Sequence, residues 1–160
     1  MDARADGVRV AHPLFQAEGD GSTPISALDL IVERITVEMA CDLNRTWHSR
    51  LPKIEVSNVV RNSDYACYGA MHNGVAYAAA IWSSPVARML NDGKTLELRR
   101  LAIAPDAPRN TASRMLAVMR RLISREMPHI DRLVSYQDTE VHTGGIYKAS
   151  GWRATRTAKG

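Results

Sequence analysis

The chain has 160 residues, of which 45% are hydrophobic and 24% are charged. This length matches one globular domain with a single core, and the composition excludes a disordered chain. No run of about 18 apolar residues is present, and the opening MDARADG has neither a basic nor an apolar stretch. We therefore expect neither a membrane span nor a secretory signal. Cys41 and Cys67 fit no zinc motif, which favours a reduced cytoplasmic compartment.

The formal net charge of +4 conceals an uneven distribution along the chain. Residues 1–40 hold three arginines against seven carboxylates, a net charge of −4. Residues 41–160 hold 18 basic against 10 acidic residues, a net charge of +8. A basic body indicates either a polyanionic partner, such as nucleic acid or a phosphate-rich cofactor, or simply a well-solvated basic surface.

The N-terminal third predicts an extension followed by one helix. Residues 1–23 read as a loop around a short strand at 8–10. Apolar residues recur at helical spacing after Thr23-Pro24, which predicts a helix from about Ile25 to Leu43. Segment 44–52 is expected to be irregular.

The middle of the chain predicts a β-hairpin. Segments 65–71 and 75–82 are rich in aromatic and small residues and flank Asn73-Gly74, a strong hairpin signal. A short helix is expected after Ser83, and the turn at 91–93 ends it.

The remaining elements alternate strands with helices. We expect a central strand at 95–104, a helix at 111–126, a strand at 131–136, a short helix at 144–150 and a last strand at 152–157. We detect no repeats or linker over residues 1–160. The order predicts one mixed α/β (α+β) domain.

The turn before the second long helix is a candidate anion site. It presents Arg109, Asn110 and Thr111 at a helix N-terminus, where unpaired N–H groups and the helix dipole favour pyrophosphate. The alternative is that Asn110 and Thr111 only cap the helix.

A second candidate site follows the strand at 131–136. Ser135 and Tyr136 end this strand, and polar residues at such strand ends often line ligand sites. Asp138 could act as a general base, and His142 as a base or metal ligand. The alternative is that Asp138 is an ordinary turn residue.

Two further residues are candidates for chemistry. His48 lies in a segment flanked by arginines, and with Asp138 and His142 it matches the composition of a two-His, one-carboxylate metal triad. Tyr147 could donate a proton to a leaving thiolate, although such a tyrosine can equally be a core aromatic.

These elements in this order resemble the GNAT acyltransferase superfamily, which implies a single domain with a central, mixed but mostly antiparallel sheet flanked by helices. LELRRLAIAP is similar to the strand whose main chain pairs with the pantetheine arm of an acyl-CoA, which implies cofactor contacts at Arg100, Leu101, Ala102 and Ile103. IYKASGW is similar to the C-terminal signature that places a tyrosine, here Tyr147, near the CoA sulfur. The usual glycine-rich pyrophosphate loop is replaced by APRNTAS, which implies cofactor contacts at Arg109, Asn110, Thr111, Ala112 and Ser113.

The combination of NRTWHS, APRNTAS, VSYQD and GGIYKASGW also resembles the Mom family of Mu-like bacteriophages, from about Asn44 to Trp152. The resemblance implies conversion of adenine in phage DNA to an N6-carbamoylmethyl-type adduct, which protects the DNA from host restriction enzymes. It also implies action in the infected bacterial cell, on double-stranded DNA. Because the target amine lies inside a duplex, the adenine is expected to be flipped into a pocket.

A cluster of basic residues agrees with a DNA partner. Cations beside an aromatic residue suit phosphate contacts with a base stacked nearby. The expected DNA-binding residues are Arg45, Trp47, Arg50, Lys53 and Arg61. Tyr65, Tyr68 and Trp82 are further stacking candidates, with packing in the core as the alternative for each.

The adduct constrains the chemistry, because N6 is joined through a methylene carbon. Attack on a thioester carbonyl would give N6-acetyladenine instead. The donor is therefore acetyl-CoA used in an unusual way or another acyl-CoA-like molecule, and iron or another divalent metal would suit activation of the methyl carbon. Nothing in the sequence identifies the source of the amide nitrogen.

The resulting hypothesis assigns base or ligand roles to Asp138 and His48, an acid role to Tyr147, and pocket-lining roles to Ser135 and Tyr136. The alternatives are a conventional N-acetyltransferase acting on a protein or small amine, and a non-catalytic DNA-binding module. Both a monomer and a homodimer are compatible with the sequence.

Overall fold

The computed structural model describes residues 23–48 and 51–136. Within these ranges, five strands form one sheet in the order β1-β2-β3-β4-β5. Strands β1 to β4 pair antiparallel, whereas β4 and β5 pair parallel. The elements are η2 (Ala27–Asp29), β1 (Ile31–Arg34), α1 (Val37–Trp47), α2 (Val56–Val60), β2 (Tyr65–His72), β3 (Val75–Ser83), η3 (Arg88–Leu90), β4 (Thr95–Ile103), α3 (Thr111–Glu126) and β5 (Arg132–Ser135).

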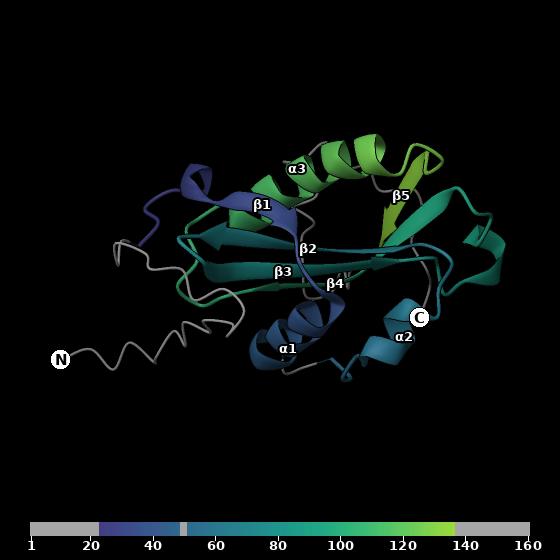
Figure 1. The fold of residues 1–160 in the computed structure, drawn as a ribbon, viewed down its shortest axis with the longest axis horizontal. Helices are drawn as coiled ribbons and strands as arrows, with labels where there is room; N and C mark the ends of the chain where they lie inside the picture. The colour runs from purple at the N-terminus through teal and green to yellow at the C-terminus, as the bar shows by residue number, and fades with distance from the viewer. Residues whose placement is uncertain (1–22, 49–50, 137–160) are drawn as a thin grey trace.

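Helices cover both faces of the sheet, as Figure 1 shows. Helix α3 packs on one face, where Met115, Leu116 and Met119 meet Trp82 and other buried side chains of the strands. Helices α1 and α2 lie on the opposite face, over a second buried cluster to which β2 and β3 contribute. The predicted mixed α/β fold with a mostly antiparallel sheet is confirmed.

The β2–β3 hairpin forms as predicted. Asn73 and Gly74 both have positive φ, 47° and 76°, which is the backbone that a two-residue hairpin turn requires. Along β3, alanines at 76, 78, 79 and 80 are all fully or nearly fully buried. Small side chains here allow helices to approach both faces of the strand closely.

The prediction of one helix from about Ile25 to Leu43 is wrong. Residues 27–29 form a 3-10 turn, β1 follows as an edge strand of the sheet, and the helix begins only at Val37. Of the apolar residues at helical spacing, Ile25, Leu28 and Ile31 are largely exposed. Pairing of this β-branched segment with the edge of β2 overrides the helical spacing.

Two more boundaries differ from expectation on this side of the sheet. Helix α1 continues through Asn44 to Trp47, a stretch expected to be irregular. Helix α2 was not predicted, because five residues are too few to show a periodic pattern. The short helix expected after Ser83 is the 3-10 turn η3, while β4, α3 and β5 form close to their predicted positions.

Several predicted elements lie outside the described residues, namely the strand at 8–10, the helix at 144–150 and the strand at 152–157. Among the helices of residues 23–48 and 51–136, none combines the length and apolar character needed to cross a bilayer.

The true start of α1 can be tested at Thr36. Its hydroxyl accepts a hydrogen bond from the Met39 N–H at 3.1 Å, as an N-cap does. We expect Thr36→Ala to lower the free energy of unfolding in urea by about 1 kcal/mol. In a helix from Ile25 the same change would lie in the helix interior and would be neutral or stabilising. As a control, Ser26→Ala, which removes the cap of the exposed turn η2, should have a smaller effect.

Candidate functional site

Strands β4 and β5 separate partway along their length. Their parallel pairing runs from Thr95 opposite Arg132 to Leu98 opposite Ser135, where β5 ends. Strand β4 continues to Ile103 while remaining paired with β3 on its other side. Among the described residues, the outer edge of β4 beyond Leu98 therefore has no strand partner.

A β-bulge lies at the same point in β4. Ile81 pairs with Arg100 but the next residue of β3, Trp82, pairs with Leu98, so Arg99 is an extra residue. Such an insertion reverses the alternation of side chains beyond it. Before the bulge Leu96 and Leu98 belong to the cluster beneath α3, and after it Leu101 and Ile103 pack against that cluster instead.

The pairing of β4 with β3 beyond the bulge fixes which backbone groups of β4 point toward β3 and which point outward from its unpaired edge. The Ala104 N–H donates to the Tyr77 carbonyl at 2.8 Å. Because alternate residues of an antiparallel strand bond to the same neighbour, the N–H and C=O groups of Ala102, two residues earlier, also point toward β3. The N–H and C=O groups of Leu101 and Ile103 therefore point outward from the open edge, where an extended ligand with amide groups can pair with them.

The N-terminus of α3 follows this edge after a tight turn. Asn110 occupies the N-cap position with a left-handed backbone (φ 69°), and its side chain forms no capping hydrogen bond. Thr111 is buried, and its hydroxyl donates to the Pro108 carbonyl at 2.6 Å. Thr111 thus stabilises the turn, while Arg109 and Asn110 are exposed beside the first turn of a 16-residue helix. The positive charge of Arg109 and the N–H groups at the start of this helix both suit a phosphate group.

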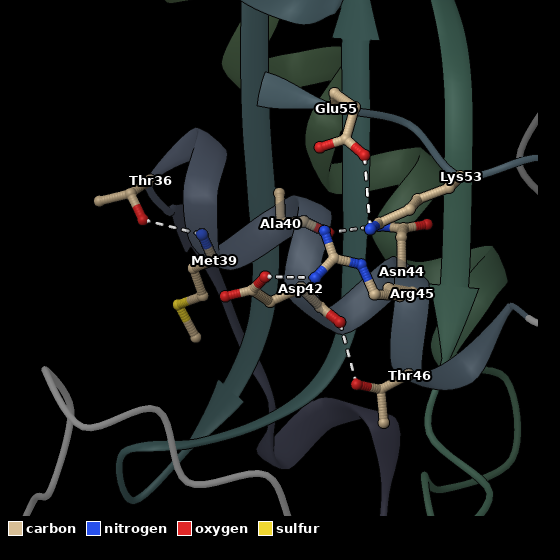
Figure 2. Close-up of polar contacts among 9 residues, drawn as sticks. All are labelled: Thr36, Met39, Ala40, Asp42, Asn44, Arg45, Thr46, Lys53 and Glu55. Atoms are coloured by element: carbon tan, nitrogen blue, oxygen red, sulfur yellow. Dashed lines mark hydrogen bonds and ion pairs between the residues drawn. The ribbon is translucent and has the colours of Figure 1, made fainter. Parts of the chain in front are cut away.

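A pocket of about 190 Å³ lies on the other face of the sheet, between α1, the segment after it and β4. We call it the basic pocket. Figure 2 shows part of its wall, with Arg45 and Lys53 over the C-terminal half of α1. Its lining residues are Asn44, Arg45, His48, Leu51, Pro52, Lys53, Ile54 and Arg100.

The cations of the basic pocket differ in their partners. Arg45 and Lys53 each lie 3.5 Å from an exposed carboxylate, Asp42 and Glu55. Such exposed pairs contribute little and are readily exchanged for a phosphate. Arg100 forms no ion pair within the described part of the chain; its guanidinium donates to the carbonyls of Arg99 and Pro52. Burial and the adjacent Arg99 charge lower the pKa of Arg100.

The structure brings several predicted site residues to this region. Ser135 pairs opposite Leu98 where the strands part, and Tyr136, which follows it, is 62% exposed. His48 caps the C-terminus of α1 and lines the basic pocket with Arg45 and Lys53. The residues Arg50, Asp138, His142 and Tyr147 lie outside the described residues.

Other predicted contacts lie away from the basic pocket. Arg61 ends α2 and does not line it. Trp47 packs against the cluster beneath α1. Tyr68 and Trp82 are fully buried in the core beneath α3, so these two cannot stack on a base, whereas Tyr65 is 37% exposed.

Two features of the site were missed by the sequence interpretation, namely the bulge at Arg99 and the buried amide of Asn44. The bulge has a signal in the sequence. Leucines at 96, 98 and 101 break strict alternation between Leu98 and Leu101, where a strand without a bulge would keep it. The buried amide of Asn44 has no signal in the sequence, because a single asparagine in a helix indicates no particular role.

A second basic surface lies on α3. Arg120, Arg121, Ser124 and Arg125 are exposed around an open hollow of about 440 Å³. Figure 1 shows that α3 lies on the opposite face of the sheet from α1. The two basic surfaces are therefore separated by the sheet.

The predicted metal triad is not tested, since of its members only His48 is described. Within residues 23–48 and 51–136, no three His, Cys, Asp or Glu side chains cluster as metal ligands would. Both cysteines are buried free thiols in the core beneath α1. Burial raises the pKa of Cys67 to about 12 and also raises the pKa of Cys41.

Several solved structures with a similar fold are described as acetyltransferases. The aminoglycoside acetyltransferase AAC(6')-Iy, in complex with a bisubstrate analogue containing CoA, has a TM-score of 0.62 and 16% identity, covering 81% of this chain and 95% of its own. An acetyltransferase from an uncultured soil metagenomic sample, in complex with trehalose, has a TM-score of 0.62 and 7% identity, covering 83% and 94%. The ribosomal-protein-alanine N-acetyltransferase of Brucella melitensis biovar Abortus 2308 has a TM-score of 0.57 and 11% identity, covering 81% and 96%.

With its separating β4 and β5, the chain has the fold of the GNAT acyltransferases. A comparison with curated proteins found no match. A family model does match most of the chain, over residues 29–159. The chain belongs to the Mom protein family.

The burial of the two thiols leads to a test. At pH 8 a thiol with a pKa of about 12 is almost entirely protonated and is a poor nucleophile. We expect Ellman's reagent to modify neither cysteine of the native chain within an hour at pH 8, and both cysteines in guanidinium chloride. Rapid reaction of the native chain would contradict the buried positions of Cys41 and Cys67.

Proposed function

We propose that the chain is a DNA-modifying transferase that converts adenine in phage DNA to an N6-carbamoylmethyl-type adduct and so protects the DNA from restriction. Membership of the Mom family carries this proposal. The separated strands and the adjoining basic pocket support it, because a two-substrate transfer needs a donor site and an acceptor site that meet.

The donor site is proposed at the open edge of β4. The outward backbone groups of Leu101 and Ile103 would pair with the amides of an acyl-CoA-type donor. Its phosphates would lie at the N-terminus of α3, near Arg109 and Asn110. The CoA complex of AAC(6')-Iy, which shares the fold, supports a donor of this class. The reactive end of the donor would then lie at the bulge.

The acceptor site is proposed at the basic pocket. Arg100 lines this pocket and directly follows the bulge, so acceptor and donor would meet at one position of β4. Arg45 and Lys53, whose side chains are about half exposed, would contact the phosphates beside a flipped adenine. His48 at the end of α1 would lie beside the reacting amine, in reach as a base.

Mass spectrometry of DNA tests the reaction. We expect nucleosides digested from the DNA of bacteria expressing the chain to include a deoxyadenosine that carries the mass of a carbamoylmethyl group. An acetyl mass would instead indicate direct transfer to N6 from a thioester. Unmodified nucleosides, together with turnover of acetyl-CoA on a protein or small amine, would support a conventional N-acetyltransferase.

The position of the DNA can be tested by salt dependence. Each phosphate contact contributes about 0.9 to the slope of log K against log salt concentration. We expect Arg45→Ala to remove one phosphate contact and so to reduce the magnitude of this slope by about 0.9. The slope is measured by fluorescence anisotropy with duplex DNA. The matched control is Arg121→Ala on α3, which removes an exposed arginine from the opposite face of the sheet and should leave the slope unchanged. The reverse pattern would place the DNA on α3.

A further inference from the structure

Asn44 has an unusual side-chain environment in the wall of the basic pocket. It is only 3% exposed, and its Nδ2 donates to the Ala40 carbonyl at 2.8 Å and to the Ala79 carbonyl of β3 at 3.4 Å. Figure 2 shows the bond to Ala40 within α1. Because both of these partners are acceptors, the amide cannot be flipped, and Oδ1 is held as the acceptor.

The Oδ1 atom of Asn44 is buried and has no hydrogen-bond partner among residues 23–48 and 51–136. Buried polar atoms are rarely left unpaired, and an exception suggests a group that is missing from the structure. Oδ1 can only accept, so the missing group must be a donor. It cannot be an anion such as phosphate, although the charged residues around the pocket, Arg45, Lys53 and Arg100, favour one.

A nucleotide in DNA satisfies both requirements. It carries phosphates for the cations and, when its base is adenine or cytosine, an exocyclic amino group for the acceptor. Adenine is the base of the proposed function. The pocket volume of about 190 Å³ is of the size of one planar base. Bases with an exocyclic carbonyl oxygen at this position, such as guanine and thymine, would place an acceptor against an acceptor.

We propose that Asn44 Oδ1 accepts a hydrogen bond from the 6-amino group of an adenine flipped into the basic pocket, and so favours adenine over bases that carry an exocyclic oxygen at this position. This inference rests on the proposed function, because it assigns the base that the same site receives. Asn44 would be a specificity-determining residue that also orients the amine toward the bulge at Arg99. Its own position is set by the bond to Ala79, which ties α1 to the sheet.

Binding of paired oligonucleotides tests the inference. The probes are two fluorescent single-stranded thymidine 12-mers with one central adenine or one central hypoxanthine, which carries an oxygen in place of the 6-amino group. We expect the native chain to bind the adenine probe about tenfold more tightly in fluorescence anisotropy. Asn44→Leu, which is close in size and lacks the acceptor, should bind both probes with equal affinity.

The matched control is Asn62→Leu. The Asn62 amide also donates to a carbonyl four residues before it, at 2.8 Å, but it lies outside the basic pocket. This variant should retain the preference for adenine. Thermal unfolding of each variant, followed by circular dichroism, shows whether it is folded at the temperature of the assay.

Equal binding of both probes by the native chain overturns the inference, and this holds even if Asn44→Leu does not fold. A preference that survives in folded Asn44→Leu also overturns it. The proposed function is tested by a different measurement, the mass spectrum of DNA from expressing cells. If that DNA contains no modified deoxyadenosine while the native chain distinguishes the two probes, the proposed function fails and the inference does not.

Discussion

The β-bulge at Arg99 is the constraint on which the rest of the site depends. It lies where β5 stops pairing with β4, and it reverses the side-chain alternation of β4 beyond that point. If the same residues continued as a regular strand, with Arg99 in the ladder, Leu101 would point to the α1 face and Arg100 to the core beneath α3. A buried arginine without a partner would be costly there. The bulge thus allows one strand to supply apolar side chains to one face and a guanidinium to the other.

The two faces of the sheet are held by different interactions. On the α3 side, Tyr68 donates to Glu126 at 2.8 Å, and Arg34 pairs with the same carboxylate at 3.0 Å, which ties β1 and β2 to the end of α3. On the α1 side, the Asn44 amide connects the helix to β3. The α3 face therefore holds a core that is tied to the strands by this carboxylate, while the α1 face combines a core with the basic pocket. Under the proposed function, this division would let donor and acceptor approach β4 from its edge and from one face.

Sequence periodicity predicted the elements with unambiguous local signals. The turn at Asn73-Gly74 specified the hairpin, and the apolar stripe of α3 specified its buried face. Periodicity gave the wrong prediction between Ile25 and Thr36, where the helical spacing indicated a helix and the β-branched composition indicated a strand. The free edge of β2 decided in favour of a strand, because pairing satisfies backbone groups that a local pattern does not register. The candidate site residues His48, Lys53, Arg100 and Ser135 came from separate segments of the sequence, and their roles stay predictions.

By itself, the sequence determined the family, the fold class, the basic character of residues 41–160 and the residue types available for chemistry. These follow from composition, motifs and local periodicity, which are properties of contiguous residues. Only the tertiary structure decided that Arg100 lines the basic pocket, that Tyr68 and Trp82 are core residues, and that the Asn44 oxygen is buried without a hydrogen-bond partner among the described residues. Each of these depends on contacts between residues far apart in the chain, because register, burial and hydrogen-bond pairing are set by the partner across the sheet.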